Sequence, residues 1–231
     1  MKGEHKIEII YAYSKTGEWH KENAIENQDF LFGCENEYAS FFAIADGVSA
    51  CKNGADGARI ACEVCADIIM DHVSYYFNSD NDKVKLIILT NIENAVKKQA
   101  VLSNTNPEEY ASTLNFVCYN KITEQVLIFS LGDSRIYRMA NGKAEYINRT
   151  LVHGHNKVCS TISYGAQNEA VLHVFNAAAD DSFLLCTDGM WKIAEADGLL
   201  NQTIELFDGE DLAKKLDRCE TRDDCSFLLV A

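Results

Sequence analysis

The sequence has few features of membrane, secreted or nucleic-acid-binding proteins. No apolar stretch approaches the length needed to span a bilayer, and the N-terminus, Met1 to His5, lacks the apolar core of a signal peptide. The 21 basic residues form no run and are outnumbered by 35 acids, which argues against a nucleic-acid phosphate backbone as partner. We therefore expect a cytoplasmic protein that binds neither membranes nor nucleic acid.

Several common catalytic motifs are missing as well. The sequence holds no glycine-rich phosphate loop, no GxSxG nucleophile turn, no HExxH zinc motif and no cysteine in a CxxxxxR phosphatase loop. These absences remove the common nucleotide-binding, serine-hydrolase, zinc-protease and cysteine-phosphatase signatures from consideration. Hydrolysis by metal-activated water remains as a chemistry that the sequence could support.

Disulfides are not indicated either. The nine cysteines are odd in number and several lie inside apolar runs, as is typical of reduced thiols. Cys62 and Cys65 form a CxxC within an amphipathic helical pattern, but no second CxxC or nearby histidine pair accompanies them. We predict buried thiols there, with a zinc or redox site as the alternative.

A chain of 231 residues with 47% hydrophobic residues predicts one domain, residues 1–231, and a monomer by default. Hydrophobic periodicity predicts helices over 57–77 and 83–102 and over most of 190–217. Residues 14–27 read as a loop, and 148–170 fit no pattern. The expected strands are 6–13, 29–32, 38–45, 112–119, 125–131, 134–140, 144–147, 170–176, 182–186 and 225–231. This order predicts an α+β layered fold with antiparallel sheets.

Two of these strands end in the same dipeptide. The short apolar runs 41–45 and 183–187 are followed by Asp46-Gly47 and by Asp188-Gly189. Runs this short and rich in Phe, Ile and Leu are typical of buried strands. Each strand therefore delivers a carboxylate at its end, followed by a residue with no side chain to prevent close approach. An ordinary turn is the alternative reading of Asp-Gly.

Other strands carry acids at their ends too. Gly132-Asp133 follows the run 126–131, Asp223-Asp224 precedes the strand 226–230, and Asp29 begins another strand. Carboxylates gathered in one place repel one another unless cations lie between them, and oxygen-only sites suit Mg²⁺ or Mn²⁺. The sequence therefore predicts a carboxylate cluster that binds divalent metal ions.

Six short motifs resemble those of the metal-dependent serine/threonine protein phosphatases of type 2C, in order and in rough spacing. They are Asn27-Gln28-Asp29, Ala45-Asp46-Gly47, Ala111-Ser112-Thr113, Leu131-Gly132-Asp133-Ser134-Arg135, Cys186-Thr187-Asp188-Gly189-Met190-Trp191 and Asp223-Asp224-Cys225-Ser226. The resemblance spans residues 17 to 231 and is closest to the compact bacterial form. It implies a four-layer α-β-β-α sandwich of two antiparallel sheets flanked by helices.

The resemblance also implies a role for each acid. Asp46 would bridge two metal ions, the Gly47 carbonyl would complete one of them, and Asp188 and Asp223 would hold the other. Asp133 would bind a third, weaker metal ion. Asp29 would orient metal-bound water. Asp224 would stand where the family has an asparagine. The alternative is an alignment shifted by one residue, in which Asp224 and not Asp223 is the ligand.

The mechanism implied is direct attack on a phosphoserine or phosphothreonine by a metal-bridging hydroxide, with no phosphoenzyme. Two Mg²⁺ or Mn²⁺ ions, with a third as an open question, would be the cofactors. The partners would be a phosphorylated protein substrate and a cognate kinase. The alternatives are a catalytically silent module that binds phosphoproteins or a kinase, and an enzyme acting on a small phosphorylated metabolite.

The chain departs from the family pattern at three positions. Ala24 stands where the family often has a phosphate-gripping arginine, so His20 or Lys21 would have to supply a positive charge. Val48 replaces a histidine, which leaves the general acid unassigned. Lys192 replaces an aspartate that supports the third metal, so that site would be weak or taken by the ammonium.

Three further residues are assigned from these patterns. His153 and His155 are the alternatives for the general acid, with surface or capping roles as the simpler reading. Arg135 is predicted to pair with an acid near the sheet edge.

Overall fold

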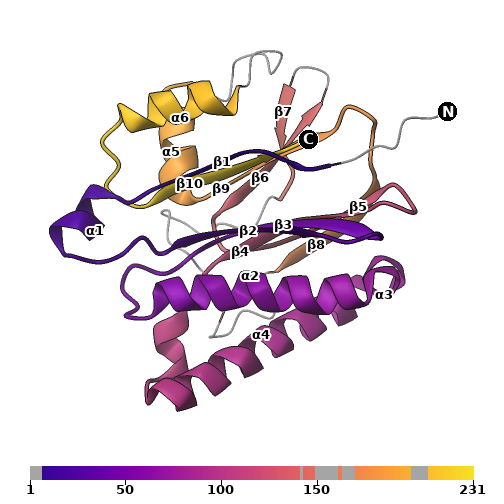
Figure 1. Ribbon diagram of the computed structural model, residues 1–231, viewed down its shortest axis with the longest axis horizontal. Helices are drawn as coiled ribbons and strands as arrows, with labels where there is room; N and C mark the ends of the chain where they lie inside the picture. The colour runs from indigo at the N-terminus through magenta and orange to yellow at the C-terminus, as the bar shows by residue number, and fades with distance from the viewer. Residues whose placement is uncertain (1–6, 141–142, 149–160, 163–169, 199–207) are drawn as a thin grey trace.

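Two antiparallel sheets stacked between two layers of helices form the structure (Figure 1). The computed structural model describes residues 7–140, 143–148, 161–162, 170–198 and 208–231. The first sheet has the order β1 (Ile9–Lys15), β10 (Cys225–Val230), β9 (Ser182–Cys186), β6 (Arg135–Ala140) and β7 (Lys143–Tyr146). The second has the order β2 (Asp29–Glu35), β3 (Ala39–Asp46), β4 (Leu114–Asn120), β5 (Gln125–Leu131) and β8 (Val171–Asn176). The predicted sandwich is confirmed.

The helices lie on the two outer faces, apart from α1 (Glu18–Glu22), which lies at one end of the sandwich (Figure 1). The others are α2 (Gly54–Asp71), α3 (Val73–Asn78), α4 (Asn81–Ser103), α5 (Asp188–Ala196) and α6 (Gly209–Asp217), with a 3₁₀ turn at Pro107–Tyr110. Helix α2 packs on β2 and β3 and against α4, whereas α5 and α6 pack on β10 and β1 of the first sheet. None of the helices in the described residues is long and apolar enough to cross a membrane.

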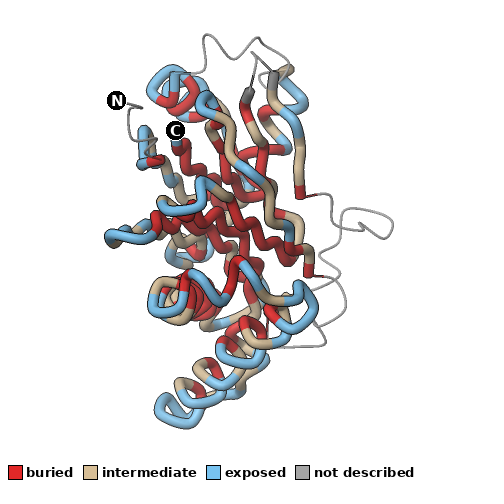
Figure 2. The backbone as a smooth tube through the Cα atoms, turned by 90° about the vertical axis from the view of Figure 1, so that its right-hand side faces the viewer, coloured by how far each residue is buried: buried red, intermediate tan, exposed pale blue. Residues whose placement is uncertain are grey.

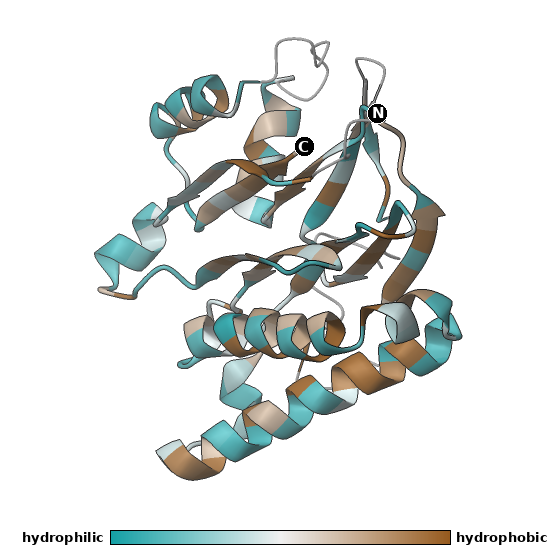
Figure 3. Ribbon diagram, turned by 45° about the vertical axis from the view of Figure 1, so that its right-hand side comes forward, coloured by the Kyte–Doolittle hydropathy of each residue, from teal (hydrophilic) through white to brown (hydrophobic). Residues whose placement is uncertain are grey.

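The central strands, such as β3, β4 and β10, are buried on both faces because each sheet lies between another sheet and a helical layer. Phe41 packs toward the helices, while the next residue, Phe42, packs into the space between the sheets. This alternation explains why the run 41–45 is continuously apolar rather than alternating. Figure 2 shows the result as buried strands that run through the middle of the molecule, and Figure 3 shows polar and apolar residues interleaved along α4.

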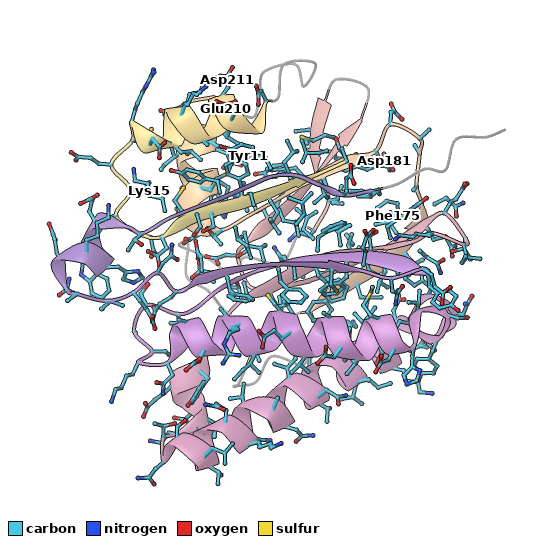
Figure 4. The ribbon with its side chains drawn as sticks, in the orientation of Figure 1. Tyr11, Lys15, Phe175, Asp181, Glu210 and Asp211 are labelled. Atoms are coloured by element: carbon cyan, nitrogen blue, oxygen red, sulfur yellow. The ribbon has the colours of Figure 1, made fainter. Side chains whose placement is uncertain are left out.

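Polar contacts fix the outer elements to the sheets (Figure 4). Lys15 donates hydrogen bonds to the carbonyls of Leu216 and Cys219, at 3.3 and 2.9 Å, and so neutralises the C-terminal end of α6. Arg138 on β6 donates two 2.7 Å hydrogen bonds to Asp181 and lies over the Phe175 ring of the other sheet. The bidentate pair ties β6 to the loop before β9, and the contact with the Phe175 ring connects this point to the second sheet.

Three sequence predictions need correction. The predicted loop 14–27 contains helix α1, whose first N–H groups, on Glu18 and Trp19, donate to the carbonyls of Thr221 and Arg222 at 2.8 and 3.1 Å. These two partners lie 203 residues further along the chain, so α1 has no local sequence signal. The predicted helix 57–77 begins earlier, at Gly54, and is interrupted at His72, whose φ of −140° is not helical.

The third correction concerns the last helical region. The predicted helix 190–217 consists of two described helices, α5 and α6, and residues 199–207 between them lie outside the described part. Cys62 and Cys65 are buried in α2, as predicted, and every cysteine in the described residues is a free thiol.

We expect Phe116→Ala to lower the free energy of unfolding by about 3–5 kcal/mol, because it leaves a cavity in a close-packed core. Phe116 is fully buried and stacks on Phe129 with ring centroids 5.3 Å apart. Urea denaturation of the variant measures the change. Tyr38→Ala, at a residue that is 51% exposed, serves as the control. A loss below about 1 kcal/mol for Phe116→Ala would contradict this packing.

Candidate metal centre

Three acidic side chains from different strand ends converge at one place. Asp46 ends β3, Asp133 follows β5, and Asp188 follows β9 of the other sheet. Each offers one carboxylate oxygen, and these three oxygens all lie within 4.8 Å of one another. The cluster therefore forms where the two sheets meet, as the repeated acid at the strand ends predicts.

Backbone hydrogen bonds hold Asp46 and Gly47 in position. The Asp46 N–H donates to Thr113 Oγ1 at 2.9 Å, and its carbonyl accepts from the Thr113 N–H at 2.8 Å. The Gly47 N–H donates to the Gln28 carbonyl at 3.0 Å. Thr113 Oγ1 also lies 3.0 Å from Ser134 Oγ, next to Asp133. These contacts leave the Asp46 side chain free to face the cluster.

In both Asp-Gly pairs the second residue has to be glycine, because another backbone segment packs directly against it. A Cβ on Gly47 would lie 2.4 Å from the backbone of Gly54, and one on Gly189 would lie 2.0 Å from the Asp224 carbonyl oxygen. No real side chain tolerates these distances. Gly47 thus lets α2 begin directly beside Asp46, and Gly189 lets α5 begin beside the loop that carries Asp223.

Both carboxylate oxygens of Asp224 accept structural hydrogen bonds. This buried carboxylate accepts from the N–H of Gly17 at 2.8 Å, from the N–H of Gln28 at 2.7 Å, and lies 2.7 Å from His20 Nδ1. Asp223, next to it, is only partly buried and accepts from Ser49 Oγ at 3.4 Å. Asp223 is outside the group of close oxygens, but its charge raises the pKa of both Asp46 and Asp188.

Asp29 connects the two sheets beside the cluster. It pairs with Asp46 in the β2–β3 register, and its Oδ2 accepts a 2.9 Å hydrogen bond from Thr187 on the other sheet. The Ser226 N–H donates to the same Thr187 hydroxyl at 3.0 Å. Asp29 is therefore positioned by both sheets, next to the predicted metal ligands.

The predicted phosphate-binding residues differ in their placement. His20 is 1% exposed and its ring contacts Asp224, so the expectation that it contacts a substrate phosphate is not met. Lys21 is exposed and pairs with Glu18 at 2.8 Å on α1. Ala24 is also exposed and offers no charge. His153 and His155 lie outside the described residues.

The carboxylates of the cluster are destabilised by burial and by one another. Burial, with the charges of neighbouring aspartates, raises the pKa of Asp29 and Asp46 well above the usual range. Burial and the nearby Asp188 charge raise the pKa of Asp133 to about 6, against the opposing effect of Lys192. Such groups are stabilised by a cation placed among them.

Unpartnered oxygens show that these residues fit a metal ion. Within the described part of the chain, the Oδ1 atoms of Asp29, Asp133 and Asp188 are buried and have no hydrogen-bond partner. A buried carboxylate oxygen without a partner costs free energy, and a hard divalent cation satisfies it. The donor set is oxygen only, as Mg²⁺ and Mn²⁺ prefer.

A cavity of about 650 Å³ lies beside the cluster. Its lining includes Asp223 and Gly189 on the cluster side, Trp19 from α1, and the cationic residues Lys192 and Arg222. Arg222 is exposed, and no carboxylate of the described residues lies within ion-pair distance of it. Arg222 was not among the residues predicted from the sequence. Its position directly before Asp223-Asp224 was the signal available.

A profile of the family described as protein phosphatase 2C matches residues 16–219, most of the chain. The chain belongs to the protein phosphatase 2C family. The predicted resemblance is confirmed, and family membership makes the chain a serine/threonine phosphatase. A search of curated proteins found no match.

Solved phosphatase structures share the fold. A bacterial serine phosphatase is 16% identical with a TM-score of 0.72, covering 97% of this chain and 98% of that one. PppA of Pseudomonas aeruginosa is 21% identical with a TM-score of 0.70, covering 97% and 96%. The Mycobacterium tuberculosis phosphatase PstP/Ppp is 17% identical with a TM-score of 0.70, covering 97% of both. At these low sequence identities, the similarity to the three structures shows a shared fold and nothing about substrates.

We expect Asp133→Asn to stabilise the metal-free phosphatase at pH 7. The wild-type carboxyl has a pKa of about 6 when folded and an ordinary value of 3.8, so it binds more protons in the folded state between these values. The wild type therefore loses stability as the pH rises from about 4 to 6, whereas asparagine does not titrate. The gain should be on the order of 1 to 3 kcal/mol at pH 7 and close to zero at pH 4.

Urea denaturation in EDTA at several pH values measures this difference. Asp208→Asn, at the exposed N-cap of α6, is a control for removing an aspartate outside the cluster. A metal-free Asp133→Asn protein that is less stable than the wild type at pH 7 would contradict the repulsion described above.

Proposed function

We propose that this chain hydrolyses phosphoserine and phosphothreonine on proteins, with two divalent cations, Mg²⁺ or Mn²⁺, held in the carboxylate cluster. The observation that carries the proposal is the convergence of Asp46, Asp133 and Asp188 at the junction of the two sheets, where the Oδ1 atoms of Asp133 and Asp188 are buried and have no hydrogen-bond partner. Family membership and the shared fold support it.

We choose the proposed metal ligands by asking which carboxylates do not already accept several structural hydrogen bonds. Asp46 would contact both metal ions, with the Gly47 carbonyl on one of them, and Asp188 and Asp223 on the other. Asp224 is excluded as a ligand because three donors already occupy it. The register in which Asp223 is the ligand is therefore the one that the hydrogen bonds favour.

The metal ions would supply Lewis acidity, lowering the pKa of water and neutralising charge on the phosphoryl oxygens. The protein would supply position. Asp29 offers its free Oδ1 as an acceptor next to Asp46, where it can orient an attacking water. In this proposal water attacks the phosphorus directly, the bond to the serine or threonine oxygen breaks, and that oxygen takes up a proton and leaves as the hydroxyl. Inorganic phosphate is the other product, and no phosphoenzyme forms.

We propose that the cavity beside the cluster admits the phosphorylated segment of the substrate. A phosphate group needs a positive charge besides the metal ions, and Ala24 does not provide one. Arg222 lines the cavity next to Asp223 and is not paired with a carboxylate in the described residues. A guanidinium in this position suits a phosphate dianion.

The substrate would be a phosphoprotein in the cytoplasm, and a cognate kinase would phosphorylate the residues that this chain dephosphorylates. The P. aeruginosa neighbour is described as a key regulatory component of a secretion system, and another neighbour belongs to the bacterial stressosome. A comparable regulatory role is proposed for this chain, acting as a monomer.

Mn²⁺-dependent hydrolysis of a phosphothreonine peptide should be measurable with the purified protein. Asp46→Asn and Asp188→Ala should each reduce kcat at least about 10³-fold, because each removes a group that holds charge at the reaction centre. Asp211→Asn, on the exposed surface of α6, should leave the rate unchanged. Phosphate release at saturating Mn²⁺ provides the measurement.

Two results would contradict this proposal. Activity that survives in Asp46→Asn would place the chemistry elsewhere. A folded wild type that binds Mn²⁺ but turns over neither the peptide nor p-nitrophenyl phosphate would favour the silent binding module.

Arg222→Ala should raise KM for the phosphopeptide about tenfold with little change in kcat, because the guanidinium would bind the phosphate in the ground state as well as in the transition state. Arg222→Lys should restore part of the affinity. Arg218→Ala, at the end of α6, is the matched control. Unchanged kinetics in Arg222→Ala would remove this residue from phosphate binding.

A further inference from the structure

Lys192 reaches into the carboxylate cluster. It lies one helical turn after Asp188 on α5, and its Nζ donates a hydrogen bond to Asp188 Oδ2. Residues four apart on a helix share one face, so the spacing itself directs Lys192 toward Asp188. The Lys192 charge also interacts favourably with the carboxylates of Asp133 and Asp223.

The helix that carries Lys192 is fixed to the loop that carries Asp133. Trp191 Nε1 donates to the Asp133 carbonyl at 2.9 Å. The guanidinium carbon of Arg135 lies 3.4 Å from the centre of the Trp191 ring, and Arg135 pairs with Glu195, an acid on α5 rather than at the sheet edge where one was predicted. These contacts set the distance between α5 and Asp133, so Lys192 is held beside the cluster by a rigid element.

No other cation has this relation to the cluster. In the described parts of the chain, Lys192 is the only lysine or arginine that forms an ion pair with Asp46, Asp133, Asp188 or Asp223. Those four side chains carry four negative charges, which two divalent cations balance. The ammonium adds one positive charge and takes one oxygen of Asp188, leaving the Asp133 side of the cluster with fewer free oxygens.

We propose that Lys192 is a built-in cation of this centre. Its ammonium, bonded to Asp188 Oδ2, takes a carboxylate oxygen that a third divalent cation beside Asp133 would need, so the wild type binds two metal ions and not three. This inference rests on the proposed metal centre. It also explains why the third metal site that the family resemblance assigns to Asp133 would be weak. A Mg²⁺ or Mn²⁺ ion bound there by two carboxylates and water would compete with the ammonium for the same oxygens.

Counting bound Mn²⁺ tests the inference without measuring activity. Calorimetric titration and electron paramagnetic resonance of free Mn²⁺ give the number of ions bound per chain. The wild type should bind two, and Lys192→Met, which keeps the length and removes the charge, should bind a third. Lys192→Asp, which adds a carboxylate, should bind that third ion at least about tenfold more tightly than Lys192→Met.

Controls separate charge from folding. Lys192→Arg should keep two ions, and so should Lys215→Met, an exposed lysine of α6. Circular dichroism and thermal unfolding check each variant, and Lys192→Gln replaces Lys192→Met if the latter does not fold.

The possible outcomes are distinguishable. Two bound ions in the wild type and in every neutral variant would overturn the role of Lys192 and leave the two-metal centre intact. Three bound ions in the wild type would overturn it as well. A wild type that binds no Mn²⁺ would overturn the metal centre itself, and with it the proposed function.

Discussion

The repulsion among carboxylates buried at the junction of two sheets is the constraint on which this structure depends. Asp46, Asp133 and Asp188 arrive from three strand ends and bring their oxygens within 4.8 Å of one another. Burial first, and then the charges of the neighbouring aspartates, raise the pKa of Asp46, Asp133 and Asp188, so the arrangement is unfavourable in the metal-free protein. It persists because the sheets, whose central strands are buried on both faces, fix the strand ends. Cations bound among these carboxylates would remove the repulsion, and this would favour metal binding.

The surrounding residues serve mainly to hold this junction together. Asp224 gathers Gly17, Gln28 and His20, so the chain near α1, the start of β2 and the loop before β10 share one buried acceptor. Gly189 allows α5 to begin against that loop. Acids of similar sequence context therefore have different roles: Asp224 organises the backbone, and its neighbour Asp223 remains available to the cluster.

Much of this architecture could be predicted from the sequence, because the local signals are strong. The apolar runs before Asp46 and Asp188 predicted buried strands with acids at their ends, and the motif order predicted the family. Other features depend on distant contacts. Helix α1 forms against residues 221–222, the burial of His20 depends on Asp224, and Arg222 lines the cavity only because the loop folds beside α5. No local pattern in the sequence encodes such pairings.

A crystal structure of the protein grown with Mn²⁺, with anomalous scattering recorded at the manganese edge, tests the central claim most directly. We predict two anomalous peaks, both next to Asp46 and one shared with Asp188 and Asp223, with Lys192 still in contact with Asp188. Peaks outside the cluster, or none in crystals grown at millimolar Mn²⁺, would contradict the claim that these carboxylates are a metal centre.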